Sequence, residues 1–118
     1  MLLKLLKSKI HRARITETHL EYEGSITVDQ RLMDAAGLVE GEGVLVANLS
    51  NGSRQETYVL KGRRGSGVVR LNGASARLGA PGDRIIIMSF ALLTPEEAHK
   101  HKPRKVVVND QNRIVRGP

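Results

Sequence analysis

Residues 44–60 read VLVANLSNGSRQETYVL, two apolar runs on either side of a turn signal. Short runs rich in Val and Leu favour strands, so we expect strands at Val44–Asn48 and Arg54–Leu60. Asn51-Gly52 between them predicts a hairpin with a type I′ turn, which needs positive φ at both central residues. This segment indicates a chain that is mostly β.

Glycine and turn residues divide the rest of the chain into pieces that are mostly too short for helices. Four further strands are expected, at Ser8–Thr16, Val68–Leu71, Arg84–Leu92 and Lys105–Val108. Short strands with few helices, in about a hundred residues, favour a small closed barrel over a layered α/β fold. We therefore expect a mainly β fold, a six-stranded barrel with short capping helices.

Two short helices carry clear start and stop signals. Asp29 can cap a helix that Gly37 ends. The second begins at residues 94–97, TPEE, a capping box with proline at the first helical position, and should stop before Pro103. The apolar face of the first helix carries Leu32, Met33 and Ala36.

The composition bounds the protein class. The 118 residues suit one domain, and the absence of cysteine excludes disulfides, thiolate nucleophiles and the usual structural zinc sites. The longest apolar stretch, Ile85–Leu93, is far shorter than the roughly 20 residues that span a bilayer. Lys4 and Lys7 interrupt the apolar start, which argues against a signal peptide. We expect a cytoplasmic protein with no membrane partner.

The net charge of +7 is compatible with a nucleic-acid partner, with a small dianionic ligand, or with a solvated basic surface. Proteins that bind single strands stack bases on aromatic side chains. The aromatic residues here are only Tyr22, Tyr58 and Phe90. Nucleic-acid binding is therefore disfavoured, but a basic, non-enzymatic barrel that binds nucleic acid stays as the alternative.

Familiar catalytic motifs are missing. The four histidines have no metal-site spacing, so we expect no metal. Gly62–Gly67 lacks the phosphate-loop spacings and is expected to be a hairpin loop, and no serine lies in a nucleophile elbow. The histidines are His11, His19, His99 and His101.

Three Gly-Ser dipeptides remain: Gly24-Ser25, Gly52-Ser53 and Gly65-Ser66. The second follows a hairpin asparagine and the third lies in an arginine-rich loop, so turns explain both. The first precedes the apolar residues 26–28. Glycine lets the chain hold a strained conformation, and the serine hydroxyl can reach the preceding carbonyl, so such a pair can undergo an acyl shift from nitrogen to oxygen.

Several short motifs resemble those of the pyruvoyl-dependent aspartate 1-decarboxylase family, and their order and spacing together are specific. They run through most of the chain: Lys9–His11, Tyr22–Ser25, Asp34–Gly37, Asn51-Gly52, Arg54, Thr57-Tyr58, Arg64–Ser66, Asn72–Ala74, and Gly82-Asp83 with Ile85–Ile87. One departure is Ser75, where the family's run has alanine. The change is mild if residue 75 acts through its backbone, and it affects fine specificity if the side chain faces the substrate.

The resemblance implies a double-psi β-barrel assembled as a homotetramer, with active sites between neighbouring subunits. It implies that the Ser25 hydroxyl attacks the Gly24 carbonyl and forms an ester through an oxyoxazolidine intermediate. Elimination would then separate residues 1–24, the β chain, from residues 25–118, the α chain. Dehydroalanine at position 25 would hydrolyse to a pyruvoyl group and ammonia. Thr57 matches the hydroxyl that steadies the negative oxygen of the intermediate.

The implied activity is decarboxylation of L-aspartate to β-alanine and CO2, which supplies pantothenate and coenzyme A synthesis. The pyruvoyl carbonyl would accept the electrons left at the α-carbon, without pyridoxal phosphate. Tyr58 matches the proton donor, and Arg54 and Lys9 would hold carboxylates. The residues that would line the substrate site are Thr57, Asn72, Gly73, Ala74 and Ser75.

Strand geometry bears on whether one subunit could hold this site. In a straight strand Arg54 and Tyr58 point to the same side about 13 Å apart, while Thr57 points to the other side. Either the strand bends or bulges, or different subunits contribute to one site, and we favour the second. A third interpretation, besides the enzyme and the barrel that binds nucleic acid, is an uncleaved relative that keeps the barrel and has lost the chemistry.

Overall fold

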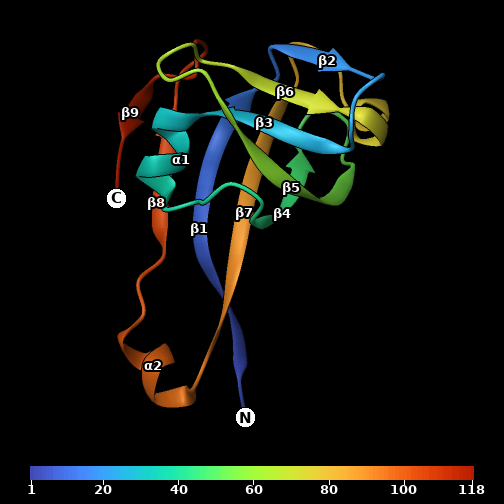
Figure 1. Cartoon of the computed structure of the whole chain (residues 1–118). Coiled ribbons are helices and arrows are strands. Elements are labelled where there is room, and N and C mark those ends of the chain that lie inside the picture. Colours follow the sequence, from blue (N-terminus) through green and yellow to red (C-terminus); the bar gives the residue numbers. More distant parts are fainter.

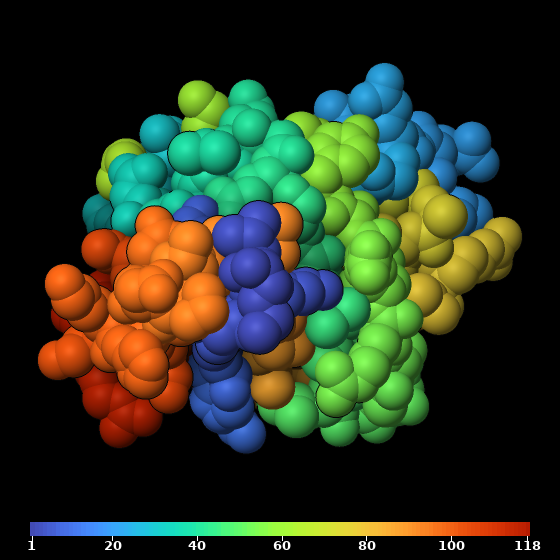
Figure 2. All heavy atoms as spheres, turned by 90° about the horizontal axis from the view of Figure 1, so that it is seen from below, coloured from blue at the N-terminus to red at the C-terminus, as the bar shows by residue number.

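The computed structural model describes residues Met1–Pro118 and consists mainly of strands, as expected. Figure 1 shows a rounded body and a long arm that extends from it. Strands β1 (Leu3–Arg14) and β7 (Arg84–Leu93) pair antiparallel over almost their whole length. The beginning of β1 and the end of β7 form the arm, and the rest of both strands lies in the body. Helix α2 (Pro95–Lys100) follows β7, and the view from below in Figure 2 places it beside the N-terminal residues at the end of the arm.

The strands form one sheet of nine in the order β2-β6-β3-β5-β4-β7-β1-β8-β9. The strands outside the arm are β2 (Glu17–His19), β3 (Ser25–Asp29), β4 (Gly43–Asn48), β5 (Arg54–Gly62), β6 (Val69–Asn72), β8 (Arg104–Val108) and β9 (Ile114–Arg116). Only Ile15 and Thr16 separate β1 from β2, so both ends of the run from β2 to β1 belong to one chain segment. The Thr16 N–H donates to the Val69 carbonyl at 2.8 Å, which helps to close this run into a barrel.

Each of the six predicted strands is present, but three strands were missed: β2, β3 and β9. The strand predicted at Ser8–Thr16 begins earlier, at Leu3, and ends at Arg14. Strand β3 matters most, because it starts at Ser25 and all of its five residues are buried. Polar Ser25, Thr27 and Asp29 alternate with apolar residues in this buried strand.

Strands β4 and β5 form the expected antiparallel hairpin, but the prediction of a type I′ turn was wrong. Gly52 has a positive φ of 79°, whereas Asn51 does not. The loop is instead held by the Asn48 side chain, whose oxygen accepts hydrogen bonds from the N–H groups of Ser50 and Asn51 at 2.7 and 3.2 Å. An asparagine that caps the turn in this way removes the need for a left-handed residue at position 51.

Loop 63–68 does not form the expected hairpin, because β5 and β6 both pair with β3 and so lie on opposite sides of it. The buried carboxylate of Asp29 holds this loop by accepting hydrogen bonds from the N–H groups of Gly65 and Gly67, at 2.9 and 2.8 Å. Burial disfavours the charged carboxylate, but the N–H donors of Gly67, Arg31 and Gly65 outweigh it and lower the pKa of Asp29.

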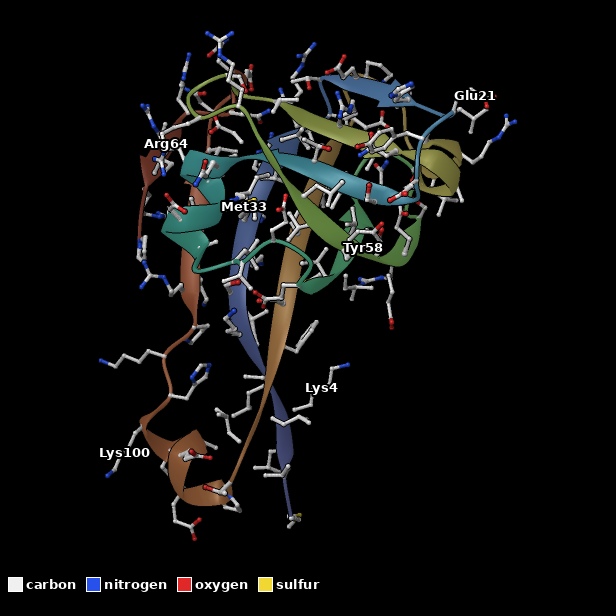
Figure 3. All side chains as sticks on the ribbon, in the orientation of Figure 1. Lys4, Glu21, Met33, Tyr58, Arg64 and Lys100 are labelled. Carbon is white, nitrogen blue, oxygen red and sulfur yellow. The ribbon has the colours of Figure 1, made fainter.

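Both predicted helices are confirmed. Helix α1 (Gln30–Ala36) is capped by Asp29 and ends at Gly37, whose φ is 72°. It buries Leu32, Met33 and Ala36, and Figure 3 shows Met33 pointing into the body. Helix α2 has the capping box and buries no residue. Neither helix has the length and apolar character needed to cross a membrane.

The core is a cluster of eighteen buried apolar residues contributed mainly by the strands. Complete burial of a Val, Leu or Ile side chain stabilises a fold by roughly 1.5–3 kcal/mol. One short element was not predicted: the 3-10 helix η1 (Gly73–Leu78), which follows β6 directly and packs against β3, β5 and β6. It places Gly73 and Ala74 next to Gly24, just before the start of β3.

Candidate active site

Ser25 lies at the start of β3 and is fully buried, although the residues just before it are exposed. Its Oγ donates a hydrogen bond to the Glu23 carbonyl at 2.9 Å. The same Oγ accepts a hydrogen bond from Asn72 Nδ2 at 3.0 Å. The hydroxyl next to the Gly24–Ser25 peptide therefore has a fixed direction.

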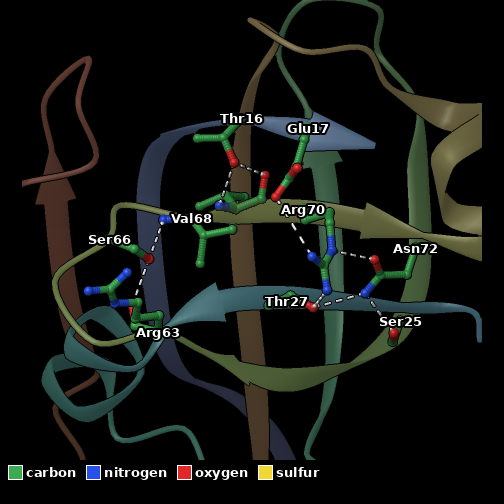
Figure 4. Close-up of polar contacts among 10 residues, drawn as sticks. Thr16, Glu17, Ser25, Thr27, Arg63, Ser66, Val68, Arg70 and Asn72 are labelled. Carbon is green, nitrogen blue, oxygen red and sulfur yellow. Dashed lines mark hydrogen bonds and ion pairs between the residues drawn. The ribbon is translucent and has the colours of Figure 1, made fainter. Parts of the chain in front are cut away.

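The Asn72 amide is the centre of a polar network around this serine (Figure 4). Its Nδ2 also donates to Thr27 Oγ1 at 2.9 Å, and its Oδ1 accepts from Arg70 Nε at 2.9 Å. Arg70 Nη1 lies 3.7 Å from the carboxylate of Glu17. The amide thus uses both hydrogens and its oxygen, which fixes its orientation.

Thr27, Arg70 and Glu17 were not predicted as site residues. Strands β3 and β6 are antiparallel with Ser25 opposite Asn72 and Thr27 opposite Arg70, which brings the four side chains together. The sequence carries a weak signal for this arrangement, since polar residues alternate with apolar ones in 25–29. That signal identifies partners only when the pairing register of the two strands is known.

Gly73 packs directly against the chain before Ser25. It has φ of 62°, and a Cβ there would lie 2.5 Å from the Tyr22 carbonyl oxygen and 2.7 Å from the Gly24 nitrogen. Both the positive φ and the lack of space for a Cβ therefore require glycine at this position. Ser75 is also buried, at 6% exposure, and its carbonyl accepts from Gln55 Nε2 at 3.4 Å. Ala74 is exposed.

Tyr58 lies near Ser25 in the same chain. Strands β3 and β5 are parallel with Ile26 opposite Val59, and Ser25 and Tyr58 each precede this pair by one residue. The β4–β5 register has no shift, so β5 has no bulge that would bring Arg54 closer to Tyr58. Arg54 is exposed at the start of the strand.

Thr57 and Lys9 each line a hollow that does not include Ser25. Thr57 lines a hollow of about 300 Å³ together with Lys4 and Phe90. Lys9 lines another, of about 550 Å³, whose charged lining residues are all basic. A single chain therefore groups Ser25, Tyr58, Asn72 and Gly73 but leaves Lys9 and Thr57 in two other hollows.

The basic hollow contains His11, whose Nδ1 is buried and has no hydrogen-bond partner. Burial of the ring, and then the charges of Lys9, Arg12 and Arg116, lower the pKa of His11. The cationic side chains of Lys9, Lys105 and Arg116 make the hollow suited to an anion. No three His, Cys, Asp or Glu side chains are grouped so that they could hold a metal ion.

The chain is similar to known proteins over nearly its whole length. The family model for aspartate decarboxylases matches residues 1–115. Aspartate 1-decarboxylase of Caldicellulosiruptor bescii is 60% identical over 116 residues, 98% of this chain and 91% of that protein. The enzyme of Bacillus cereus strain G9842 is 54% identical over 111 residues, 94% of this chain and 87% of that protein.

A solved structure identifies the fold. The computationally designed protein msDPBB_sym2, a double-psi β-barrel, is similar with a TM-score of 0.52 and 20% identity. The match covers 74% of this chain and 99% of the designed one, so the barrel class predicted from the resemblance is confirmed. The whole sheet has nine strands where six were predicted, and β8 and β9 lie outside the run that closes. By the family match and by relatives more than half identical over nearly its whole length, the chain belongs to the aspartate decarboxylase family.

Proposed function

We propose that this chain is a precursor that cleaves itself between Gly24 and Ser25, and that the product decarboxylates L-aspartate to β-alanine and CO2. Family membership supports the activity, which would supply pantothenate and coenzyme A synthesis. The observation that carries the cleavage is the fully buried Ser25 hydroxyl, held between the Glu23 carbonyl and the Asn72 amide. The single domain of 118 residues would divide into residues 1–24 and 25–118.

Self-cleavage needs a nucleophilic lone pair on Ser25 Oγ. The oxygen has two lone pairs, and the Asn72 amide occupies one. The other can form a bond to the Gly24 carbonyl carbon while the C–N bond to residue 25 breaks and the hydroxyl proton passes to the freed amine. We assign Thr57, from a neighbouring subunit, the role of steadying the negative oxygen of the intermediate.

The ester then eliminates. Residue 25 loses its α-hydrogen, its Cβ–Oγ bond breaks, and Gly24 leaves as a carboxylate at the end of the β chain. Water replaces the nitrogen of the dehydroalanine with oxygen, and ammonia departs. The atoms balance without an added oxidant or reductant, so the chain needs only water to form a pyruvoyl group at position 25.

The surroundings of Ser25 fit a small carbonyl group. The position is fully buried, Gly73 encloses it closely, and Asn72 supplies an amide donor. The pyruvoyl group supplies a carbonyl that accepts the electron pair left when CO2 departs. We propose no metal ion and no pyridoxal phosphate in this reaction.

Burial of Ser25 implies that the uncut chain does not admit aspartate. The chain before the scissile bond packs so closely on Gly73 that a Cβ added there would lie 2.5 Å from the Tyr22 oxygen and 2.7 Å from the Gly24 nitrogen. Cleavage gives this segment a free end at Gly24, which allows it to move away. Self-processing would then both create the reactive group and open the path to it.

The remaining residues bind and protonate the substrate. Tyr58, close to Ser25 by strand register, would give its proton to the α-carbon after CO2 has left. Arg54 and Lys9 would hold the carboxylates, since guanidinium and ammonium groups bind them with charge-assisted hydrogen bonds. The substrate site would be lined by Thr57, Asn72, Gly73, Ala74 and Ser75.

These assignments require more than one copy of the chain, and we propose a cytoplasmic homotetramer with active sites between subunits and no nucleic-acid or membrane partner. Lys9 lines a hollow that does not include Ser25 of the same chain. The arm exposes Leu2, Phe90 and Leu92 at 59%, 36% and 64%, an apolar surface that another copy can cover. Light scattering should give the mass of four chains, and full activity in a verified monomer would contradict the assembly.

The activity is tested with aspartate labelled in its α-carboxylate. Purified wild-type protein should release labelled CO2 and form β-alanine, and Ser25→Ala should do neither. An uncut wild-type chain that is inactive on aspartate but binds RNA in a salt-dependent manner would support the nucleic-acid alternative. An uncut chain with neither property would support the inactive relative.

A further inference from the structure

We propose that Arg70 is a positioning residue for self-cleavage, because it sets which end of the Asn72 amide faces the Ser25 hydroxyl. This inference rests on the proposed cleavage at Gly24–Ser25. Arg70 lies on β6 and does not contact Ser25 itself. It acts through Asn72 and Thr27.

The guanidinium group has several contacts in the network. Arg70 Nε donates to Asn72 Oδ1 at 2.9 Å, and Nη2 lies 3.4 Å from Thr27 Oγ1. The Glu17 carboxylate lies 3.7 Å from Nη1 and holds the other edge of the group (Figure 4). The planar guanidinium is therefore restrained on both sides, as a more flexible lysine would not be.

The direction of the amide decides what the serine hydroxyl does. With Oδ1 toward Arg70, the Nδ2 hydrogens reach Ser25 Oγ and Thr27 Oγ1 at 3.0 and 2.9 Å. A half-turn of the amide would present Oδ1 to Ser25 and draw its hydrogen away from the Glu23 carbonyl. Arginine has donors only, so the reversed amide would also place Nδ2 against a cation.

The observed direction favours attack on Gly24. Ser25 Oγ keeps its hydrogen on the Glu23 carbonyl and one lone pair free. A charged donor on Oδ1 also polarises the amide and strengthens the hydrogen bond that Nδ2 donates. Arg70 thus fixes the hydroxyl through two bonds in series.

Arg70 also contacts the chain on the other side of the scissile bond. Its guanidinium carbon lies 5.8 Å from the ring centre of Tyr22, and that ring stacks on His19 with centres 5.5 Å apart. Tyr22 precedes Gly24 by two residues. One side chain thereby restrains both the segment that carries the attacked carbonyl and the amide that directs the nucleophile.

The test compares Arg70→Ala and Arg70→Lys with Arg77→Ala, a matched control because Arg77 is exposed on η1 and lies outside the network. The loss of precursor is followed by intact mass in freshly refolded protein, with circular dichroism to verify the fold. Arg70→Ala should slow cleavage about tenfold, which corresponds to about 1.4 kcal/mol on the barrier. Arg70→Lys should be intermediate, and Arg77→Ala should equal wild type.

Chemical rescue separates positioning from a merely structural role. The Arg70 side chain is 29% exposed, so free guanidinium can enter the space left in Arg70→Ala. Guanidinium at non-denaturing concentration should restore cleavage of that variant, whereas potassium at equal ionic strength should not. Cleavage of Arg70→Ala at the wild-type rate, or a slow variant that guanidinium does not rescue, would overturn the inference. A wild-type chain that never cleaves would instead contradict the proposed function.

Discussion

The same dipeptide occurs in three places in this chain, and the three differ in their surroundings rather than in their chemistry. Gly52 and Gly65 both have φ of 79°, so a left-handed turn accounts for each glycine. Gly24 has no positive φ and precedes a buried strand. Turn geometry therefore does not explain the first pair.

The hydroxyl groups differ as well. Ser53 Oγ donates to the Leu78 carbonyl at 2.9 Å and is part of a surface loop. Ser66 is exposed, and its Oγ lies between the Arg63 carbonyl and the Val68 N–H. Only Ser25 combines complete burial with a side-chain amide donor. We therefore expect reactivity in a Gly-Ser pair to depend on a buried, oriented environment, where electrostatic interactions are stronger than in water.

The largest difference among the three Gly-Ser pairs is expected when the serine hydroxyl is removed. Ser25→Ala has no hydroxyl and should remain full length, with complete loss of cleavage and of activity. Ser53→Ala and Ser66→Ala are the matched controls and should yield fragments at the wild-type rate. Gel electrophoresis of the three purified variants measures the outcome, and a cut Ser25→Ala chain would refute the assignment.

Substitutions at Arg54 and Thr57 should separate self-cleavage from aspartate turnover. Arg54→Ala should cleave normally but lose about 100-fold in aspartate turnover, or about 2.7 kcal/mol, because its partner is a substrate carboxylate. Thr57→Ala should do the reverse and slow cleavage. Each variant is assayed for fragment formation first and then for CO2 release. Normal turnover by cleaved Arg54→Ala would exclude its role in carboxylate binding.

Asp29, at the other end of β3, tests whether a buried polar group in this strand can stabilise the fold without taking part in cleavage. Asp29→Asn loses the charged acceptor for Gly65 and Gly67 and should destabilise the fold by about 1–3 kcal/mol, yet leave Gly24–Ser25 cleavage intact. The measurement is thermal unfolding of both forms, alongside fragment analysis.

The pH dependence of this contribution has a definite sign. The pKa of Asp29 is lowered in the folded chain from the ordinary value of 3.8. Its stabilisation is therefore complete above that value and is lost as the pH falls below it through the folded-state pKa. The stability gap between wild type and Asp29→Asn should narrow over that acid range, and a gap that widens there would contradict the lowered pKa.

The smallest effect is expected at Ser75. Its side chain is nearly buried, and its carbonyl is held by Gln55. Ser75→Ala restores the residue expected in the family and should change aspartate turnover less than about threefold, within roughly 0.7 kcal/mol. Steady-state rates with aspartate provide the measurement, and a large change in KM would mean that the side chain faces the substrate.

Local signals predicted much of the fold. The caps at Asp29 and Thr94 and the strands with apolar runs were recovered because each depends on neighbouring residues. Strand β3 was missed because its five residues alternate between polar and apolar although both faces of the strand are buried. In so short a segment this pattern cannot be distinguished from the residues that lead into the helix capped by Asp29. The hairpin predicted around loop 63–68 is wrong because β3 lies between the two flanking strands, a long-range feature that local sequence does not reveal.

The residues of the candidate site also fall into two groups, those predicted from the sequence and those that were not. Ser25, Tyr58, Asn72 and Gly73 were predicted through the family resemblance and lie together in the chain. Thr27, Arg70 and Glu17 were not, because their proximity depends on the register of β3 and of β2 with β6. The homotetramer and the contribution of Lys9 from another subunit stay predictions, since a single chain contains no intersubunit contact.

The most direct test of self-cleavage is the mass balance of the wild-type chain. Intact mass spectrometry should find residues 1–24 and 25–118, whose masses add up to the precursor plus one water minus one ammonia. The larger fragment should resist N-terminal sequencing and react with phenylhydrazine, because a keto acyl group replaces its amine. Fragments that add up to the precursor plus one water, with a free serine amine at position 25, would indicate ordinary hydrolysis and contradict formation of a pyruvoyl group.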